Sequence, residues 1–475
     1  MTPGNSYDLV VVGSGTGGYV AAIRAAQLGL KTAVVEREPV LGGTCLNWGC
    51  IPTKAWLEHA HAYKLAQQSA EWGISFGTDR GPTIDFGRIN ERKNKIVTSL
   101  TKGVEYLFKK NRIDWVKGTG RLAGGGNVEV TNGTDAMVLS ARDIVVATGS
   151  APRSIPNVVI DKTHIITSDD AIDATSAPAS LAILGSSAVG VEFASIFRQF
   201  GSVVTLLEVQ PRLVPSEDAA VSAELEKAFR KRGIAVRTGV QVSSAVVDGP
   251  GVVVEMTDTV GASHTLRVEK LLVATGRGPV TNGLGATEIG LAMRNGFIVV
   301  DNHYRTSVEG ISAIGDVISV GGQPHAQLAH LSSAEGVLVA ERIAGREIEP
   351  INYDHVPAST YCDPEIGSVG LTEAEAKAHG YDVRVGSFPF SILGRARIAG
   401  ETDGFVKIVA ERQYDQVLGV HIIGPRATEL VGEATVALRL ESTAEELIRT
   451  IHSHPTMSEA IGEAAHAVHG HAIHI

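Results

Sequence analysis

The sequence predicts an α/β protein made of two parallel-sheet α/β repeats followed by a separate α+β domain. In the first repeat, a short apolar run meets a glycine-rich turn at residue 13 and then a helical stretch. The same order returns at residue 185. After Pro350 the pattern changes to alternating strands and amphipathic helices. In this last part we expect strands at 405–409 and 417–423 and helices at 429–440 and 444–450.

The first repeat begins with residues 7–12, a continuous apolar run that is typical of a buried parallel strand. The turn Gly13-Ser-Gly15-Thr-Gly-Gly18 follows, and residues 19–28 are predicted to form a helix. A second strand, residues 31–35, ends at Glu36. This order is that of a Rossmann-type dinucleotide-binding motif.

The second repeat has the same spacing as the first. Its strand (181–184) leads into the turn 185–190, and the acidic residue Glu208 lies 23 positions after the first glycine, as Glu36 does (208 − 185 and 36 − 13). A helix-terminating glycine lies 16 positions after the first glycine in both copies (29 − 13 and 201 − 185). We infer an internal duplication that gives two Rossmann-like units.

The repeats divide the chain into four predicted domains. These are residues 1–150, 151–277, 278–347 and 348–475. A helical region at about 53–111 interrupts the first domain, whose strands resume near Asp114.

Each glycine of the first turn has a mechanical role. Gly13 makes the tight turn, Gly15 lets the backbone approach a pyrophosphate, and Gly18 lets the helix pack on the strand. The helix N-terminus then faces the phosphates, and Glu36 accepts hydrogen bonds from a ribose.

The second turn departs from this pattern because Ser187 occupies the middle position between Gly185 and Gly190. Its hydroxymethyl group is expected to crowd the pyrophosphate unless the backbone shifts. Glu208 favours a free ribose 2′-hydroxyl and repels a 2′-phosphate, so NAD is expected rather than NADP.

Cys45 and Cys50 form the candidate redox pair. Four residues separate them, which is wider than the usual spacing of paired metal ligands, and no second pair follows nearby. A disulfide across so short a loop is more often catalytic than stabilising, and the alternative is two buried, reduced thiols. If this segment is helical, Lys54 shares a face with Cys50 and can stabilise a thiolate or a reduced flavin.

Composition excludes several classes of function. The net charge is −10 with no run of clustered Lys and Arg, so nucleic-acid binding is not expected. The apolar stretches are too short to cross a bilayer, and the N-terminus lacks the pattern of a secretion signal. We expect a cytoplasmic protein without a membrane partner.

The segment Gly42-Gly-Thr-Cys45-Leu-Asn-Trp-Gly-Cys50-Ile-Pro-Thr-Lys54 resembles the active-site sequence of the class I pyridine nucleotide–disulfide oxidoreductases. Within that family it is most similar to the members that oxidise dihydrolipoyl groups. The resemblance covers essentially the whole chain. It also includes the motifs at 147–149, 274–277, 313–316, 328–330 and 452–459.

This resemblance implies an FAD-binding domain (1–150), an NAD-binding domain (151–277), a central domain that completes the FAD site (278–347) and a C-terminal dimerisation domain (348–475). Glu36 would contact the adenosine ribose of FAD and Asp316 its ribitol chain. The implied cofactor-binding residues are Gly13, Gly15, Gly18, Glu36, Gly43, Thr44, Lys54, Gly120, Thr148, Gly149, Asp316, Gln327, Leu328, Ala329 and His330 for FAD, and Gly185, Ser187, Gly190, Glu208 and Gly276 for NAD.

The resemblance also implies the catalytic roles. His454, oriented by Glu459, would be a general base that acts on Cys45 from the partner subunit of a homodimer. Lys54, paired with Glu192, would tune the flavin. Electrons from a dihydrolipoyl group, free or on a carrier domain, would pass through the Cys45–Cys50 disulfide and FAD to NAD.

Two alternatives remain open at this point. One is a related glutathione- or mercuric-reductase-like enzyme, although the chain lacks the C-terminal cysteine pair expected of a mercuric or thioredoxin-type reductase. The other is a subunit retained mainly for docking to the acyltransferase core of a 2-oxo acid dehydrogenase complex.

Three further features are the turn at Pro279, the lone cysteine Cys362 and the histidines of the C-terminal tail. Pro279-Val-Thr departs from the family pattern, in which Asn follows the proline, and the contacts of that turn are uncertain from the sequence. Cys362 is interpreted as structural. The tail histidines are not expected to bind metal; they are His466, His469, His471 and His474.

Overall fold

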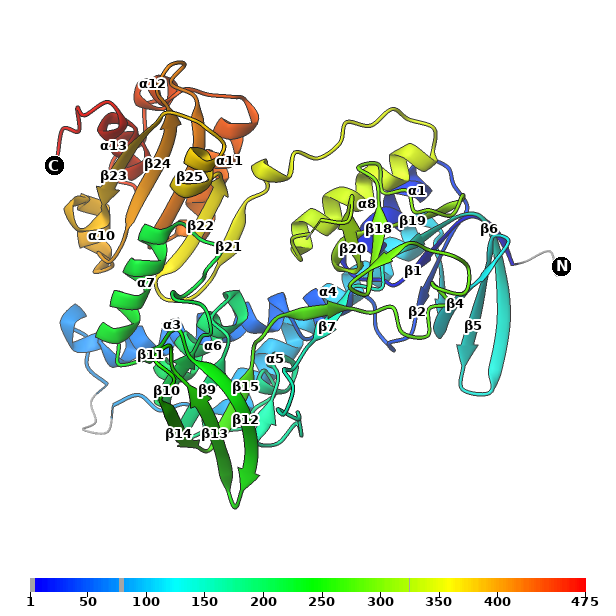
Figure 1. The fold of residues 1–475 in the computed structure, drawn as a ribbon, viewed down its shortest axis with the longest axis horizontal. Coiled ribbons are helices and arrows are strands. Elements are labelled where there is room, and N and C mark those ends of the chain that lie inside the picture. The colour runs from blue at the N-terminus through cyan, green and yellow to red at the C-terminus, as the bar shows by residue number, and fades with distance from the viewer. Residues whose placement is uncertain (1–4, 77–80, 324) are drawn as a thin grey trace. The chain divides into compact units, whose positions relative to one another are not determined.

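The computed structural model describes residues 5–76, 81–323 and 325–475 (Figure 1). The chain divides into two compact units, each built from segments that are distant in the sequence. Unit 1 comprises Met1–Ala55, Gly87–Arg153 and Arg277–Ile351, and unit 2 comprises Trp56–Phe86, Ser154–Gly276 and Asn352–Ile475. The boundaries of the four domains stay a prediction.

The first repeat forms the central sheet of unit 1. Its strand order is β3 (Asp114–Lys117), β2 (Thr32–Glu36), β1 (Ser6–Val12), β6 (Asp135–Val146), β5 (Asn127–Asn132) and β4 (Thr119–Gly124). β1 pairs in parallel with β2 and β6, and β19 (Ile311–Ala313) adds to β6, also in parallel. Val10 and Val11 are fully buried, as expected for a strand covered on both faces.

Two helices pack closely beside this sheet. Helix α1 (Thr16–Gln27) contacts β1 and β2, and helix α8 (Ala329–Ile343) lies along α1 (Figure 1). The close approach requires glycine, because a Cβ on Gly336 would lie 2.5 Å from the carbonyl oxygen of Gly17. The segment after residue 300 therefore completes the fold of the first repeat.

The remaining elements of unit 1 are short apart from two helices. They are α2 (Gly43–Asn47), the start of α3 (Cys50–Gln67), α4 (Phe86–Asn111), β7 (Ser150–Pro152), β16 (Arg277–Pro279), β17 (Met293–Arg294), β18 (Phe297–Val300), η2 (Gly315–Val317) and β20 (Ile318–Val320).

The second repeat, in unit 2, forms a parallel sheet. Its order is β11 (Ala235–Arg237), β10 (Val203–Leu207), β9 (Ser180–Leu184), β15 (Lys270–Val273) and β8 (Ile165–Ile166). Helix α6 (Ala188–Gln199) connects β9 to β10, and α7 (Ala219–Lys231) connects β10 to β11. The antiparallel sheet of β12 (Gln241–Asp248), β13 (Gly251–Thr257) and β14 (Ser263–Val268) follows, and short helices η1 (Ser69–Trp72) and α5 (Ser168–Ala171) also belong to unit 2.

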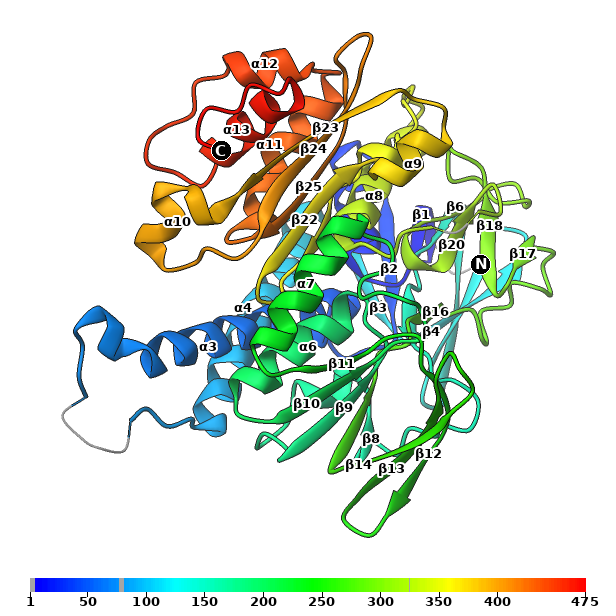
Figure 2. The same ribbon diagram turned by 60° about the vertical axis from the view of Figure 1, so that its left-hand side comes forward.

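The C-terminal part of unit 2 is a five-stranded antiparallel sheet covered by helices (Figure 2). Its order is β21 (Ala358–Thr360), β22 (Glu365–Gly370), β25 (Val417–Gly424), β24 (Phe405–Glu411) and β23 (Val383–Pro389). Helix α11 (Ala427–Arg439) packs on β22 and β25, and α13 (Glu459–Val468) packs on β23 and β24. The other elements are η3 (Tyr353–His355), α9 (Glu373–Ala378), η4 (Phe390–Ile392), α10 (Gly394–Ala399) and α12 (Ala444–Arg449).

The predicted fold class is confirmed: the chain contains two Rossmann-like units and a C-terminal α+β part. The helical interruption predicted at 53–111 corresponds to α3, η1 and α4. In the part of the chain that the structure describes, no helix combines the length and apolar character needed to cross a membrane.

Candidate active site

The first glycine-rich turn has the geometry that a pyrophosphate needs. Gly13 has φ of +105°, and a Cβ there would lie 2.3 Å from the carbonyl oxygen of Ala147. A Cβ on Gly18 would lie 2.0 Å from the carbonyl oxygen of Gly13. By contrast, a Cβ on Gly15 would meet nothing within 4 Å. This open space at the N-terminus of α1 can admit a phosphate to the backbone.

Glu36, at the end of β2, is held by its neighbours on both carboxylate oxygens. Its Oε2 accepts hydrogen bonds from the backbone N–H and hydroxyl of Ser14, at 2.9 and 2.6 Å. Its Oε1 accepts from the backbone N–H of Glu38 at 2.9 Å. The carboxylate is therefore fixed beside the turn. Sequence reasoning missed Ser14, which could have been found because a serine follows the first glycine in both turns.

The second turn repeats these contacts. Glu208 Oε2 accepts hydrogen bonds from the backbone N–H and hydroxyl of Ser186, at 2.8 and 2.7 Å, and its Oε1 accepts from the N–H of Gln210 at 2.8 Å. A Cβ on Gly190 would lie 2.0 Å from the carbonyl oxygen of Gly185. The duplication inferred from spacing thus extends to individual hydrogen bonds.

Ser187 fits the second turn without a backbone shift. Its φ and ψ are −71° and −178°, and those of Gly15 are −61° and −179°. The side chain is exposed and makes no capping hydrogen bond with α6. Because the middle position needs no positive φ, serine occupies it without conformational strain.

Cys45 and Cys50 are brought together by a tight loop between α2 and α3. A Cβ on Gly49 would lie 2.8 Å from the carbonyl oxygen of Thr44, so the loop has no room for a larger residue. The two cysteines are free thiols in this structure and are hydrogen-bonded to each other. α3 begins at Cys50 and includes Lys54, which confirms the helical spacing expected for that pair.

The surroundings of Cys45 favour the protonated thiol. The hydrogen bond with Cys50 and burial both raise the pKa of Cys45 well above its ordinary value. The positive charge of Lys54 opposes this rise, and the negative charge of Asp316 adds to it. A group that can give a proton to Cys45 or take one from it is therefore needed when the Cys45 sulfur changes its bonding partner.

Asp316 lies at the end of a hydrogen-bonded chain within unit 1. Arg277 Nε donates to the hydroxyl of Ser150 at 2.7 Å, and that hydroxyl donates to Asp316 at 2.6 Å. Burial raises the pKa of Asp316, while the bond from Ser150 lowers it. Sequence reasoning missed Ser150, and it named Arg277 only as part of the motif at 274–277, without a role in the site. The available signal was that each directly follows the Ala-Thr-Gly triplet of its repeat.

Gly43 and Gly120 lie close to the first turn. A Cβ on Gly43 would lie 2.6 Å from the Cα of Gly15, and a Cβ on Gly120 would lie 3.0 Å from Cγ1 of Val12. A side chain at either position would therefore crowd the first turn or the strand that leads into it. Thr44 follows Gly43 on α2.

The turn at Val280, which was uncertain from the sequence, is anchored in unit 1. The hydroxyl of Thr148 donates to the carbonyl oxygen of Val280 at 2.7 Å, and the N–H of Val280 donates to the carbonyl oxygen of Gly149 at 2.9 Å. Gly149 and Gly276 have positive φ, +70° and +101°.

The predicted flavin-side segment lies at the start of α8. Leu328 is its N-cap residue, and Ala329 and His330 form its first turn. Gln327 Nε2 donates to the carbonyl oxygen of Asp316 at 3.4 Å. The structure thus joins this segment to Asp316 within unit 1.

His454 and Glu459 form a hydrogen-bonded pair in unit 2. His454 Nδ1 lies 2.8 Å from Glu459 Oε1, and the N–H of Thr456 donates to Glu459 Oε2 at 2.8 Å. The histidine side chain is 79% exposed. Burial alone would raise the pKa of Glu459, but its bonds with His454 and Thr456 lower it overall. Because Glu459 holds the ring of His454 at Nδ1, the orientation of the other ring nitrogen, Nε2, is fixed as well.

Glu192 is buried on α6, and its Oε1 accepts a hydrogen bond from the backbone N–H of Tyr361 at 2.9 Å. Lys54 belongs to unit 1, and both Glu192 and His454 belong to unit 2. The pairing of Lys54 with Glu192 and the action of His454 on Cys45 stay predictions.

Cys362 is buried, and its thiol lies 3.1 Å from the carbonyl oxygen of Pro364. Burial raises the pKa of this thiol. In the tail, His469 is bonded to Asp415 and His474 to Glu463, each at 2.8 Å. Across residues 5–76, 81–323 and 325–475, no group of three or more His, Cys, Asp or Glu side chains is arranged to hold a metal ion.

Comparison with known proteins identifies similar chains. A family model described as pyridine nucleotide-disulphide oxidoreductase matches residues 7–336, and a model of the dimerisation domain of that family matches residues 356–465. Dihydrolipoyl dehydrogenase of Bacillus subtilis is 43% identical over 484 residues, covering 98% of this chain and 99% of that protein. Dihydrolipoyl dehydrogenase of Zymomonas mobilis is 42% identical over 471 residues, covering 98% and 99%. The crystal structure of LpdA from Mycobacterium tuberculosis is 27% identical, with a TM-score of 0.87 over 96% of this chain and 98% of that one.

Proposed function

We propose, from the premise that this chain belongs to the pyridine nucleotide-disulphide oxidoreductase family, that it oxidises dihydrolipoyl groups to lipoyl groups and reduces NAD. The observation that carries this proposal is the pair of hydrogen-bonded thiols, Cys45 and Cys50, which lie in a tight loop on a chain about two-fifths identical to dihydrolipoyl dehydrogenases.

The first glycine-rich turn and the Asp316 network fit FAD. The open space at Gly15 suits the pyrophosphate, Glu36 suits the adenosine ribose, and Asp316 suits the ribitol hydroxyls. FAD, when bound, supplies two-electron chemistry between a dithiol and a nicotinamide. The chain contributes the binding groups and the environment of the thiols. We accordingly assign residues 1–150 and 278–347 to the FAD site.

The second turn fits NAD, and we assign residues 151–277 to it. The fixed carboxylate of Glu208 can accept hydrogen bonds from the ribose hydroxyls, and it would repel the 2′-phosphate of NADP. Ser187 has the backbone conformation of Gly15 and an exposed side chain, which supports a pyrophosphate at this turn. These features support NAD as the preferred nucleotide.

In this proposal the thiol chemistry consists of two successive thiol–disulfide exchange steps. One substrate thiol loses its proton to His454 Nε2 and attacks Cys45 in the Cys45–Cys50 disulfide, which breaks the S–S bond and frees Cys50 as a thiolate. The second substrate thiol attacks the substrate sulfur of the mixed disulfide, and its proton passes by way of His454 to the departing Cys45 sulfur, so the S–S bond to Cys45 breaks, lipoyl is released and Cys45 is left as a thiol. Glu459 keeps the ring of His454 oriented through the contact at Nδ1.

Two chains are needed for this site in our proposal. The dimerisation-domain match over residues 356–465 supports a homodimer in which His454 of one chain serves Cys45 of the other. The dihydrolipoyl group would be free or carried on a lipoyl domain. Association with the acyltransferase core of a 2-oxo acid dehydrogenase complex would place such a carrier nearby.

A substrate panel tests the function. We expect the purified holoenzyme to turn over free dihydrolipoamide with NAD, and to have far lower kcat/KM for glutathione disulfide with NADPH. Preference for the second pair of substrates would contradict the proposal and favour a glutathione-reductase-like enzyme. No turnover with either pair, in protein that contains FAD, would favour a docking subunit.

A further inference from the structure

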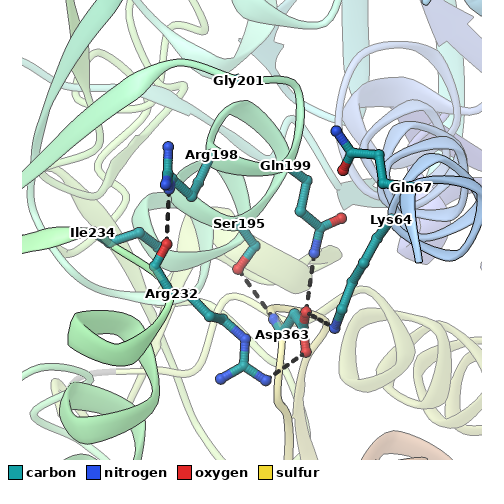
Figure 3. Close-up of a pocket in the computed structure, with 9 residues that line it drawn as sticks. All are labelled: Lys64, Gln67, Ser195, Arg198, Gln199, Gly201, Arg232, Ile234 and Asp363. Carbon is teal, nitrogen blue, oxygen red and sulfur yellow. Dashed lines mark hydrogen bonds and ion pairs between the residues drawn. The ribbon is translucent and has the colours of Figure 1, made fainter. Parts of the chain in front are cut away.

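A pocket of about 320 Å³ lies within unit 2, and none of the residues that line it belongs to the thiol segment or to either glycine-rich turn (Figure 3). Its walls come from α3, α6, the residues that follow α7, and the loop between β21 and β22. Its volume is within the range of pockets that hold small molecules. The charged residues that line it are Lys64, Arg198, Arg232 and Asp363.

Asp363 is the centre of the hydrogen bonds in this pocket (Figure 3). Its carboxylate accepts from Lys64 at 2.6 Å, from Gln199 at 3.0 Å and from Arg232 at 3.1 Å, and its backbone N–H donates to the hydroxyl of Ser195 at 3.0 Å. Burial alone would raise the pKa of Asp363, but Arg232 and Lys64 lower it overall. Asp363 is therefore ionised at neutral pH.

Arg198 has a different set of partners. Its guanidinium donates to the carbonyl oxygens of Arg232 at 2.7 Å and Ser202 at 3.3 Å. Within the described residues, no carboxylate lies within ion-pair distance of Arg198. Carbonyl oxygens satisfy its N–H groups but do not neutralise its charge.

Positive charge exceeds negative charge in this cluster. Arg232 also pairs with Asp403 at 3.0 Å, and Asp403 pairs with Lys231 at 3.0 Å. The cluster thus has four cationic and two anionic side chains, a formal charge of +2 (4 − 2). These are Lys64, Arg198, Lys231 and Arg232 with Asp363 and Asp403.

We propose that this pocket is a binding site for a small dianion, either a dicarboxylate or a phosphate monoester. Two negative charges would balance the cluster, and carboxylate or phosphate oxygens would accept from the ammonium of Lys64 and the guanidinium of Arg198. The ammonium has three donors, of which Asp363 takes one. The partial burial of these side chains limits screening by salt.

The test uses the FAD-containing enzyme with saturating NAD, so that the second glycine-rich turn is occupied and cannot bind the probe. Succinate and glycerol 3-phosphate are titrated separately by calorimetry, against chloride at equal ionic strength. We expect saturable binding of one probe, and which one binds distinguishes a dicarboxylate from a phosphate ligand. Absence of saturable binding for both would overturn the proposal.

Two variants from different helices locate the binding. Arg198→Gln and Lys64→Gln should each raise the Kd of the probe by roughly tenfold or more, which is the effect of losing one charged hydrogen bond. The matched control is Arg230→Gln, which removes an exposed arginine of α7 that is paired with Glu226 outside the pocket. Because the two variants are independent, misfolding of one leaves the other decisive. Binding that both variants leave unchanged would place the anion elsewhere and refute the assignment.

Discussion

In each repeat, one glutamate carboxylate accepts the same set of hydrogen bonds from the glycine-rich turn and the residues around it. Glu36 and Glu208 each accept two hydrogen bonds from the serine after the first glycine and one from a backbone N–H two residues downstream. The carboxylates are thus fixed before any nucleotide binds, which reduces the entropy lost on binding.

His454 is predicted to act as a base only in the thiol half of the reaction. His454→Gln should slow reduction of the enzyme by dihydrolipoamide by roughly a hundredfold or more, the scale expected for a lost general base. Reduction by NADH should change much less. Rapid-mixing absorbance of the flavin under anaerobic conditions measures both halves.

The matched control is His474→Gln, which removes another exposed histidine bonded to a glutamate, Glu463, at 2.8 Å. It should leave both half-reactions unchanged. If His454→Gln slowed the two halves equally, His454 would be a structural residue and not the base.

His452 is predicted to make stability depend on pH. Its bond with Glu433, at 2.7 Å, raises the pKa of His452 above its ordinary value of 6.5. A histidine with a raised pKa in the folded state contributes stability that is complete below pH 6.5 and is lost as the pH rises through the folded value. His452→Gln should therefore cost about 1 kcal/mol at about pH 6 and less at about pH 8.5.

The unfolding midpoints of both proteins at the two pH values measure this difference. If His452→Gln lowered the free energy of unfolding equally at both pH values, or more at the higher pH, the charge of His452 would not contribute to stability.

At the scale of elements, the strand–turn–helix of each repeat could be predicted because its signals are local. The apolar run, the glycines and the acidic residue lie within 30 positions, counted from Tyr7 to Glu36 (36 − 7 + 1). The chain from Arg277 through Ser150 to Asp316 could not be predicted, since its members are 127 and 166 positions apart. The antiparallel strands β12–β14 were not predicted either, although buried and partly buried residues alternate along β13 as is typical of a strand.

The second turn gives a prediction about which of its positions require glycine. Gly190→Ala should raise the Kd of NAD by roughly tenfold or more, because its Cβ would lie 2.0 Å from the carbonyl oxygen of Gly185. Ser187→Gly should change the Kd by less than about threefold, since Ser187 already has the backbone of Gly15.

Fluorescence titration with NAD measures both constants, and the FAD content reports whether the first repeat is intact. Equal effects of the two substitutions would show that the second turn does not bind the pyrophosphate as proposed.

At the scale of the whole molecule, the proposed reactive groups are separated in the sequence and in the two compact units. Cys45 and Cys50 belong to unit 1, and His454 belongs to unit 2. The match of residues 356–465 to a dimerisation domain offers a route by which thiols and base can meet across a two-fold axis. A symmetric dimer would then have two composite sites, and a monomer would have none.

Mixing two inactive variants tests this central claim most directly. Cys45→Ser chains lack the attacked sulfur, and His454→Gln chains lack the base, so neither homodimer should oxidise dihydrolipoamide at more than a small fraction of the native rate. After subunit exchange, each mixed dimer would contain one intact site, formed by Cys45 of one chain and His454 of the other. We predict that activity returns in proportion to the mixed dimers, to as much as half the native value per dimer. No recovery, with exchange demonstrated by differently tagged chains, would place the thiols and the base in the same chain and contradict the shared site.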